Sequence, residues 1–151
     1  FATTMDVILE VLEEQKMSGK KYDYVCCMYP CTPLLSQEII HKSLTILKQN
    51  NYDLVFPIIK YSFPIQRAVK INNLNRIEMI NPEYLTTRSQ DLPETFHDAG
   101  QFYFFKTNSL LSKRKLITDN TGYIILNENE TQDIDNKSDW ELARLKYKMK
   151  K

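Results

Sequence analysis

Hydrophobic residues recur at helical spacing in three stretches of the chain, and cap-forming polar residues precede each stretch. The first two stretches, residues 3–19 and 36–50, begin with hydroxyl side chains that can accept hydrogen bonds at a helix N-terminus. The third begins near Ser138, which has the spacing of a capping box with Glu141. Its lysine-rich end, from Lys146 onward, is expected to be a solvated helix terminus. The pattern therefore predicts three amphipathic helices.

Short apolar runs lie between these helices. Residues 22–29 and 53–59 are apolar on both faces, as expected for strands of a covered parallel sheet. Further strands are expected at residues 101–105 and 123–126. The order strand, helix, strand over residues 22–59 is typical of a right-handed βαβ unit. We therefore expect an α/β fold, with a mostly parallel sheet flanked by helices.

The middle of the chain has a different character. Two strand-like runs between residues 68 and 80 flank the turn-forming residues 72–75, which is the pattern of a β-hairpin. Residues 84–96 are polar and are expected to extend away from the core. We therefore expect one domain over residues 1–151, with a β-rich excursion at about residues 63–96.

Composition narrows the possible functions. The 20 basic and 19 acidic residues give a net charge of +1, so no overall field attracts nucleic acid or anionic membranes. With only three glycines, the chain contains neither a dinucleotide-binding loop nor a Walker loop. The three cysteines lie within six residues, which favours reduced thiols over a disulfide framework. No apolar run reaches the roughly 18 residues of a membrane span. These features predict a cytoplasmic protein that contacts neither nucleic acid nor membrane.

Two carboxylates precede the C-terminal helix. Asp133 and Asp135 project to the same side if their backbone is extended, because side chains alternate along an extended chain. Paired carboxylates are suitable ligands for Mg²⁺, which could bridge and neutralise the phosphates of a nucleotide. A structural interpretation stays open, in which Asp135 or Asn136 only begins the next helix.

Other polar residues allow both a functional and a structural interpretation. Arg88 could clamp a phosphate or carboxylate through two hydrogen bonds or could lie on the surface, and Gln66 and Arg67 allow the same two interpretations. His97 could contact a ligand or form structural hydrogen bonds. Tyr29 begins a loop with two prolines at the carboxyl end of a predicted strand, where open α/β sheets bind ligands.

Five segments resemble the sugar cytidylyltransferases, a family that activates nonulosonic acids such as N-acetylneuraminic acid with CTP. They are Y-P-C-T-P-L at 29–34, F-P-I-Q-R-A at 63–68, T-R-S-Q-D-L-P at 87–93, H-D-A-G-Q-F-Y at 97–103, and D-I-D at 133–135 followed by D-W at 139–140. The resemblance runs in order from about residue 3 to the end. It implies a Rossmann-like nucleotide-sugar transferase fold and a homodimer formed through the excursion. The implied reaction is attack of the sugar 2-hydroxyl on the α-phosphate of CTP, giving CMP-sugar and pyrophosphate.

The resemblance also implies roles for individual residues. Asp133 and Asp135 match magnesium-binding aspartates, and Arg88 matches the arginine of a sugar-binding segment, so all three are expected in catalysis. The expected substrate-binding residues are Tyr29, Gln66, Arg67, Gln90, His97, Gln101 and Tyr103. Departures from the sialic acid pattern, such as Ala99 in place of asparagine, cluster at the sugar. They favour pseudaminic acid, with N-acetylneuraminic, legionaminic or Kdo-type acids as the alternatives.

One feature of the family has no counterpart in the chain, namely the opening glycine- and lysine-containing loop that holds the CTP phosphates. The N-terminal part of the family domain is therefore expected to be missing. Because backbone N–H groups and a lysine supply much of the charge stabilisation in phosphate sites, we expect the chain alone to be inactive or nearly so. In a different interpretation, the chain is a non-catalytic dimerisation module.

Overall fold

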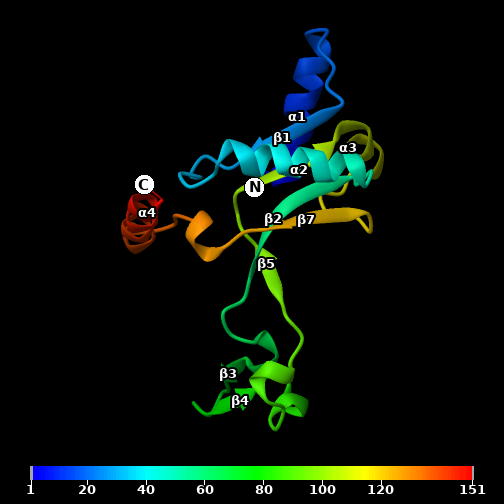
Figure 1. Ribbon diagram of the computed structural model, residues 1–151. Coiled ribbons are helices and arrows are strands. Elements are labelled where there is room, and N and C mark those ends of the chain that lie inside the picture. The colour runs from blue at the N-terminus through cyan, green and yellow to red at the C-terminus, as the bar shows by residue number, and fades with distance from the viewer. Residues whose placement is uncertain (1, 151) are drawn as a thin grey trace. The chain divides into compact units, whose positions relative to one another are not determined.

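The computed structural model describes residues 2–150 and divides the chain into two compact units (Figure 1). Unit 1 comprises Phe1–Ile58 and Asp98–Lys151, and unit 2 comprises Ile59–His97. The predicted excursion lies within unit 2, and its part in dimerisation stays a prediction. No helix within residues 2–150 is long and apolar enough to cross a membrane.

Helices α1 (Thr4–Met17) and α2 (Gln37–Gln49) form where the hydrophobic spacing predicted them. The Thr3 side chain accepts a hydrogen bond from a backbone N–H in the first turn of α1, and the Ser36 side chain does the same for α2. Each cap satisfies an N–H group that the helix itself leaves without a partner. A shorter helix, α3, spans Thr107–Lys113.

Helix α4 (Lys137–Met149) begins earlier than the capping pattern predicted. The Asn136 side chain accepts hydrogen bonds from the N–H groups of Ser138 and Asp139 at 2.9 and 3.2 Å. The Asp139 carboxylate in turn accepts from the Asn136 N–H at 3.1 Å. The predicted Ser138–Glu141 capping box is therefore wrong, because Asn136 and Asp139 have the same spacing and form the cap first. The interpretation of Asn136 as the start of the helix is confirmed.

The main sheet has the strand order β1-β6-β2-β5, and β7 also pairs with β2. Its strands are β1 (Tyr24–Met28), β2 (Leu54–Lys60), β5 (Phe96–Asp98), β6 (Phe102–Lys106) and β7 (Thr121–Ile125). Strands β1 and β2 each run antiparallel to β6, whereas β7 runs parallel to β2, so β1, β2 and β7 share one direction. The α/β fold class is confirmed, whereas the expectation of a mostly parallel sheet is corrected to a mixed sheet, because β6 runs antiparallel between β1 and β2. The expected βαβ unit is present with one difference, since β6 lies between the two strands that α2 connects.

A buried cluster joins the sheet of unit 1 to its helices. Its members are Ile8, Leu12, Leu54, Tyr103, Phe105 and Leu110. Burial of each large apolar side chain contributes roughly 1.5–3 kcal/mol to stability. Because Tyr103 belongs to this cluster, a residue predicted to bind substrate is anchored directly in the core.

An irregularity beside β2 determines the geometry of the candidate site. Val55 of β2 pairs with Phe104 of β6, whereas the Pro57 carbonyl, two residues further along β2, accepts from the Ala99 N–H at 3.0 Å. The intervening residues outnumber their partners on β2 and therefore form a bulge. Gly100, within it, has a φ of 62°, a left-handed conformation that glycine adopts without steric cost. Such bulges re-aim neighbouring side chains and recur next to active sites.

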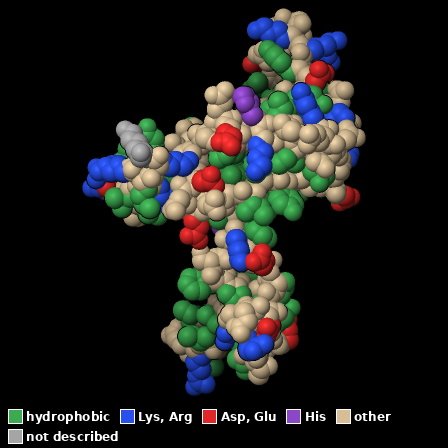
Figure 2. Space-filling model, in the orientation of Figure 1, with side chains coloured by type: hydrophobic (Ala, Val, Ile, Leu, Met, Phe, Trp, Pro, Cys, Tyr) green, Lys and Arg blue, Asp and Glu red, His purple; other side chains and the backbone are tan. Residues whose placement is uncertain are grey.

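Unit 2 contains the predicted hairpin. Strands β3 (Val69–Ile71) and β4 (Ile77–Met79) pair antiparallel, and Ile71 lies opposite Ile77. The unit also contains the 3-10 turns η1 (Ile65–Arg67), η2 (Pro82–Tyr84) and η3 (Ser89–Asp91). Hydrophobic side chains lie on its surface (Figure 2). The side chains that are exposed by 70% or more are Phe63, Ile71, Leu74 and Ile77.

Candidate active site

The carboxyl end of β1 lies beside the Gly100 bulge. The backbone N–H of Tyr29, directly after β1, donates to the carbonyl oxygen of Gln101 at 3.0 Å. The segment that follows β7 reaches the same bulge, because the Thr131 hydroxyl donates to the Ala99 carbonyl at 3.3 Å. Three segments that are far apart in the sequence therefore meet at this end of the sheet.

The carboxylate of Asp133 lies against the bulge. A methyl group at Gly100 would lie 3.5 Å from Asp133 Oδ2, an ordinary van der Waals distance. The other carboxylate oxygen accepts a hydrogen bond from the N–H of Ile134 at 3.1 Å. Asp133 nevertheless remains exposed to solvent. A carboxylate has about four lone-pair sites, so Asp133 keeps the capacity to bind a further donor or a cation.

The first turn of α4 positions Asp135. The backbone N–H of Asp135 donates to Oδ2 of Asp139 at 3.0 Å, the same oxygen that accepts from Asn136. The carboxylate of Asp139 is thus used for helix capping, whereas Asp135 is exposed. The cap fixes the backbone that carries Asp135 and does not consume its carboxylate.

Lys146 of α4 fastens the segment that carries Asp133. Its ammonium donates to the Thr131 carbonyl and to Oε1 of Gln132, both at 2.9 Å. Partial burial lowers the pKa of Lys146, and the nearby charge of Glu128 opposes this effect. The prediction of a wholly solvated lysine end is therefore wrong at this residue. No sequence signal marks Lys146, because its partners are a backbone carbonyl and an amide rather than a charged motif.

Tyr103 lies at the centre of an aromatic and hydrogen-bonded group. Its ring packs edge-on against Tyr29 and is tilted against Phe56, with ring centroids 5.7 and 5.8 Å apart. Its hydroxyl donates to Oδ2 of Asp98. Burial raises the pKa of Tyr103, and the hydrogen bonds to Asp98 and Tyr29 raise it further. The phenol therefore stays protonated at neutral pH and acts as a hydrogen-bond donor.

Gln101 supports the bulge from within the protein. Its side chain is fully buried, and Nε2 donates to the Ala99 carbonyl at 3.2 Å. Its Oε1 has no hydrogen-bond partner among the described residues. The structure thus places Gln101 with Tyr29, Tyr103 and Asp133 around the bulge, while its contact with a substrate stays a prediction.

Within unit 2, two of the motifs predicted to bind substrate lie together. The guanidinium of Arg67 donates to the Ser89 hydroxyl in η3 at 3.3 Å. Arg88 forms two hydrogen bonds with the Asp91 carboxylate, at 2.6 and 3.2 Å, and its side chain is 71% exposed. Gln90, between them, is exposed. The geometry of Arg88 is that of a bidentate carboxylate clamp whose present partner belongs to the same turn.

Gln66 and His97 have extensive contacts inside unit 2. Gln66 is buried, and its Nε2 donates to the Pro93 carbonyl at 3.1 Å. The ring of His97 packs against the ring of Tyr61, with centroids 4.7 Å apart. The packing of His97 agrees with its structural interpretation, whereas Gln66 is buried and does not lie on the surface as its structural interpretation had it. Contact of either residue with a substrate stays a prediction.

The carboxylates after β7 fit a magnesium ion that takes only one or two of its ligands from the protein. Within residues 2–150, no group of three or more His, Cys, Asp or Glu side chains is arranged to hold a metal ion. Magnesium does not need such a cage, because it is commonly bound by one or two carboxylates with water and substrate phosphates completing the octahedron. Asp133 and Asp135, both exposed, fit this requirement.

The chain is similar to curated pseudaminic acid cytidylyltransferases. It is 32% identical over 149 residues to the enzyme of Campylobacter jejuni subsp. jejuni serotype O:2, which covers 99% of this chain and 64% of the relative. It is also 31% identical over 134 residues to the pseudaminic acid cytidylyltransferase and UDP-2,4-diacetamido-2,4,6-trideoxy-beta-L-altropyranose hydrolase of Helicobacter pylori, covering 88% of this chain and 25% of that protein. The chain therefore spans less than two thirds of these relatives. No family model matches it.

A solved structure with the same fold is that of CMP:2-keto-3-deoxy-manno-octonic acid synthetase complexed with CTP. The match covers 99% of this chain and 68% of the solved one, with a TM-score of 0.60 and 11% sequence identity. At this identity the comparison shows the fold alone, and it supports the α/β arrangement described above.

Proposed function

The chain is homologous to the pseudaminic acid cytidylyltransferases over nearly all of its own length, and from this premise we propose that it forms part of an enzyme that transfers CMP from CTP to pseudaminic acid. The observation that carries the proposal is the meeting of the Asp133 segment with the Gly100 bulge. This contact brings an exposed carboxylate to the carboxyl end of β1, and open α/β sheets bind nucleotides at such ends.

In the proposed reaction the sugar 2-hydroxyl oxygen attacks the α-phosphorus of CTP. The bond from this phosphorus to the bridging oxygen breaks, pyrophosphate leaves, and the hydroxyl proton passes to solvent. Negative charge on the phosphates must be stabilised during this step. Asp133 and Asp135 would hold Mg²⁺, which supplies positive charge beside the phosphates when it is bound.

Side chains of this chain are proposed to orient the sugar. The Tyr103 hydroxyl donates its proton to Asp98, which leaves its oxygen as a fixed hydrogen-bond acceptor beside the ring of Tyr29. Such a combination of an apolar ring with a few placed polar groups suits a sugar. Arg88 is proposed to bind the sugar carboxylate by exchanging its bidentate contact with Asp91 for one with the substrate.

The reaction and the sugar are tested together by pyrophosphate release from the intact gene product. CTP and Mg²⁺ are supplied, and pseudaminic acid and N-acetylneuraminic acid are offered in parallel. We expect a strong preference for pseudaminic acid. Release with N-acetylneuraminic acid alone would overturn the sugar assignment, and a folded protein that releases pyrophosphate with neither sugar would count against the reaction.

The role of Asp133 is tested by Asp133→Asn, which keeps the shape of the side chain and removes its charge. Loss of a metal ligand beside the phosphates costs several kcal/mol of transition-state stabilisation, so kcat/KM of the intact gene product should fall at least about 100-fold. Asp119→Asn is the matched control, because Asp119 is an exposed carboxylate in the loop before β7. Near-normal turnover by Asp133→Asn would remove Asp133 from the site.

We propose further that two copies of the chain pair through unit 2. The support is the exposure of Phe63, Ile71, Leu74 and Ile77, since apolar side chains gathered on one small unit mark interaction surfaces. The chain has no glycine- and lysine-containing phosphate loop, so the chain alone is proposed to lack turnover. A dimeric gene product without pyrophosphate release would favour the alternative function, a non-catalytic dimerisation module.

A further inference from the structure

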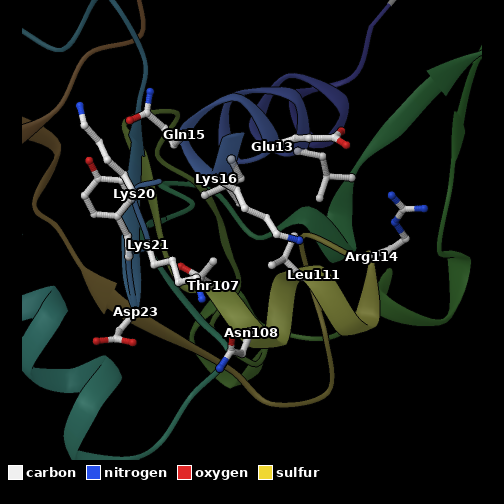
Figure 3. Close-up of a pocket in the computed structure, with 13 residues that line it drawn as sticks. Glu13, Gln15, Lys16, Lys20, Lys21, Asp23, Thr107, Asn108, Leu111 and Arg114 are labelled. Atoms are coloured by element: carbon white, nitrogen blue, oxygen red, sulfur yellow. The ribbon is translucent and has the colours of Figure 1, made fainter. Parts of the chain in front are cut away.

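A cavity of ≈ 560 Å³ lies in unit 1 (Figure 3). Its walls come from residues 9–16 of α1, residues 20–23, α3 and Arg114 at the end of α3. Residues 22–23 precede β1, whereas Tyr29 follows it, so the cavity lies at the end of β1 away from the Gly100 bulge. Its volume is in the range of roughly 300–1,000 Å³ that small-molecule sites occupy. It is thus independent of the active site proposed above.

The lining of the cavity combines apolar surface with an excess of positive charge. Leu9, Leu12 and Leu111 contribute the apolar part. The charged lining residues are the cations Lys16, Lys20, Lys21 and Arg114 and the anions Glu13 and Asp23. Figure 3 shows the side chains of Lys16 and Lys21 extending toward α3. None of the four cationic side chains forms an ion pair or hydrogen bond within residues 2–150.

Thr107 supplies a second, independent indication of a ligand. Its side chain lines the cavity and is only 7% exposed. Its backbone N–H donates to the Asp23 carbonyl at 2.9 Å, whereas its hydroxyl has no hydrogen-bond partner among the described residues. A buried hydroxyl without a partner is destabilising. An oxygen-bearing ligand in the cavity would give it one.

The backbone conformation of Arg114 is a further indication of a ligand site. Arg114 ends α3 in the left-handed conformation, with φ 50° and ψ 37°, and its N–H donates to the Leu110 carbonyl at 2.9 Å. Glycine is the residue usually found in this conformation, because a Cβ atom makes it unfavourable. Strained residues of this kind concentrate where the side chain has a function. Here the strained residue contributes a guanidinium to the cavity.

We propose that this cavity binds a small organic anion in which a phosphate or carboxylate group is attached to an apolar body. The unpaired cations would neutralise the acidic group, the Thr107 hydroxyl would donate to one of its oxygens, and the leucines would cover the apolar part. A free inorganic ion would contact the cationic side chains but would leave the leucine side chains exposed to water. The site should therefore prefer the organic anion.

Titration of the chain with phenyl phosphate, followed by amide and arginine side-chain NMR signals, tests this site directly. Saturable shifts are expected at the Thr107 amide and the Arg114 Nε–H, with inorganic phosphate binding roughly 10-fold more weakly because it buries no apolar surface. Benzoate in a parallel titration distinguishes a carboxylate from a phosphate head group. Shifts confined to the residues around Tyr29 and Asp133 would overturn the proposal, as would equal affinities for phenyl phosphate and inorganic phosphate.

Two variants sharpen the test. Arg114→Gly removes the guanidinium and at the same time suits the left-handed backbone, so folding is retained. It should weaken phenyl phosphate binding roughly 10-fold, the usual effect of losing one charge-assisted hydrogen bond. Lys16→Ala should also weaken it, whereas Lys42→Ala, on the exposed face of α2, should not. Unchanged affinity in both Arg114→Gly and Lys16→Ala would exclude the site.

Discussion

Asp53 shows at the scale of one residue how a buried carboxylate joins separate parts of unit 1. Asp53 is only 8% exposed. The Lys113 ammonium and the Thr118 hydroxyl donate to its Oδ2 at 2.5 and 2.7 Å. Burial raises the pKa of Asp53, but hydrogen bonds from Lys113, Thr118 and Ser109 outweigh it and lower the pKa to about 2. The charged carboxylate therefore links the start of β2 to α3 and to the loop before β7.

This pKa predicts how the stability contribution of Asp53 depends on pH. Because the folded value of about 2 lies below the ordinary value of 3.8, the contribution is complete above 3.8 and is lost as the pH falls toward 2. Asp53→Asn should lower the free energy of unfolding at pH 7 by about 2 kcal/mol. This difference in free energy between the variant and the natural protein should become smaller in acid. Urea unfolding at pH 7 and pH 3 measures both values. Asp119→Asn, at an exposed carboxylate, should cost little at either pH, and a difference for Asp53→Asn that is as large at pH 3 as at pH 7 would contradict this account.

At the scale of elements, Gly122 sets the approach of Tyr52 to β7. Gly122 pairs with Val55 in the parallel ladder, and a methyl group at this position would lie 2.2 Å from Cδ2 of the Tyr52 ring. The ring or the strand must therefore move in Gly122→Ala. Overpacking of this kind costs roughly 1–3 kcal/mol, in addition to any loss of strand pairing.

Gly19→Ala is a suitable comparison for this substitution. Gly19 has a φ of 78° and open space around the position of an added methyl group, so its cost is the backbone conformation alone, about 1 kcal/mol. In thermal unfolding, Gly122→Ala should have the lower melting temperature of the two variants. Equal losses would indicate that Tyr52 moves aside without cost.

The elements also show what sequence patterns can and cannot predict. Thr3 and Ser36 mark helix starts correctly, because a cap is a local interaction between neighbouring residues. A strand is correctly predicted within residues 22–29, where β1 lies, but its antiparallel neighbour β6 is about 80 residues away in the chain. Hydrophobic periodicity reports the covered faces of a strand and carries no information on which strand lies beside it.

The candidate site divides in the same way. The resemblance selected Tyr29, Tyr103 and Asp133, and the structure places them around one bulge. The bulge itself could not be predicted, since it results from the register of β2 against two strands rather than from Gly100 alone. The hydrogen bond of Lys146 to the Thr131 carbonyl also could not be predicted from the sequence, because it depends on how α4 packs against the segment that follows β7.

At the scale of the whole molecule, the exposed apolar surface of unit 2 leads to a prediction about assembly. Ile71 and Ile77 lie opposite each other in the β3–β4 ladder, and each is 76% exposed. A two-stranded hairpin alone is only marginally stable in water and gains stability when an apolar face is covered. A second copy of unit 2 offers the same apolar residues, which is the self-complementary arrangement of a twofold dimer.

Ile71→Asp places a charge in the centre of this proposed interface and should raise the dimer dissociation constant at least about 30-fold, as expected for an interface residue worth about 2 kcal/mol or more. Sedimentation equilibrium over a range of micromolar concentrations measures the constant. Ile117→Asp is the matched control, because Ile117 is 59% exposed in unit 1 and the same change there should leave association unaltered. A natural chain that is monomeric at high micromolar concentration would refute the dimer. A dimer that survives Ile71→Asp but not Ile117→Asp would move the interface to unit 1, and the exposed isoleucines of the hairpin would then need another partner.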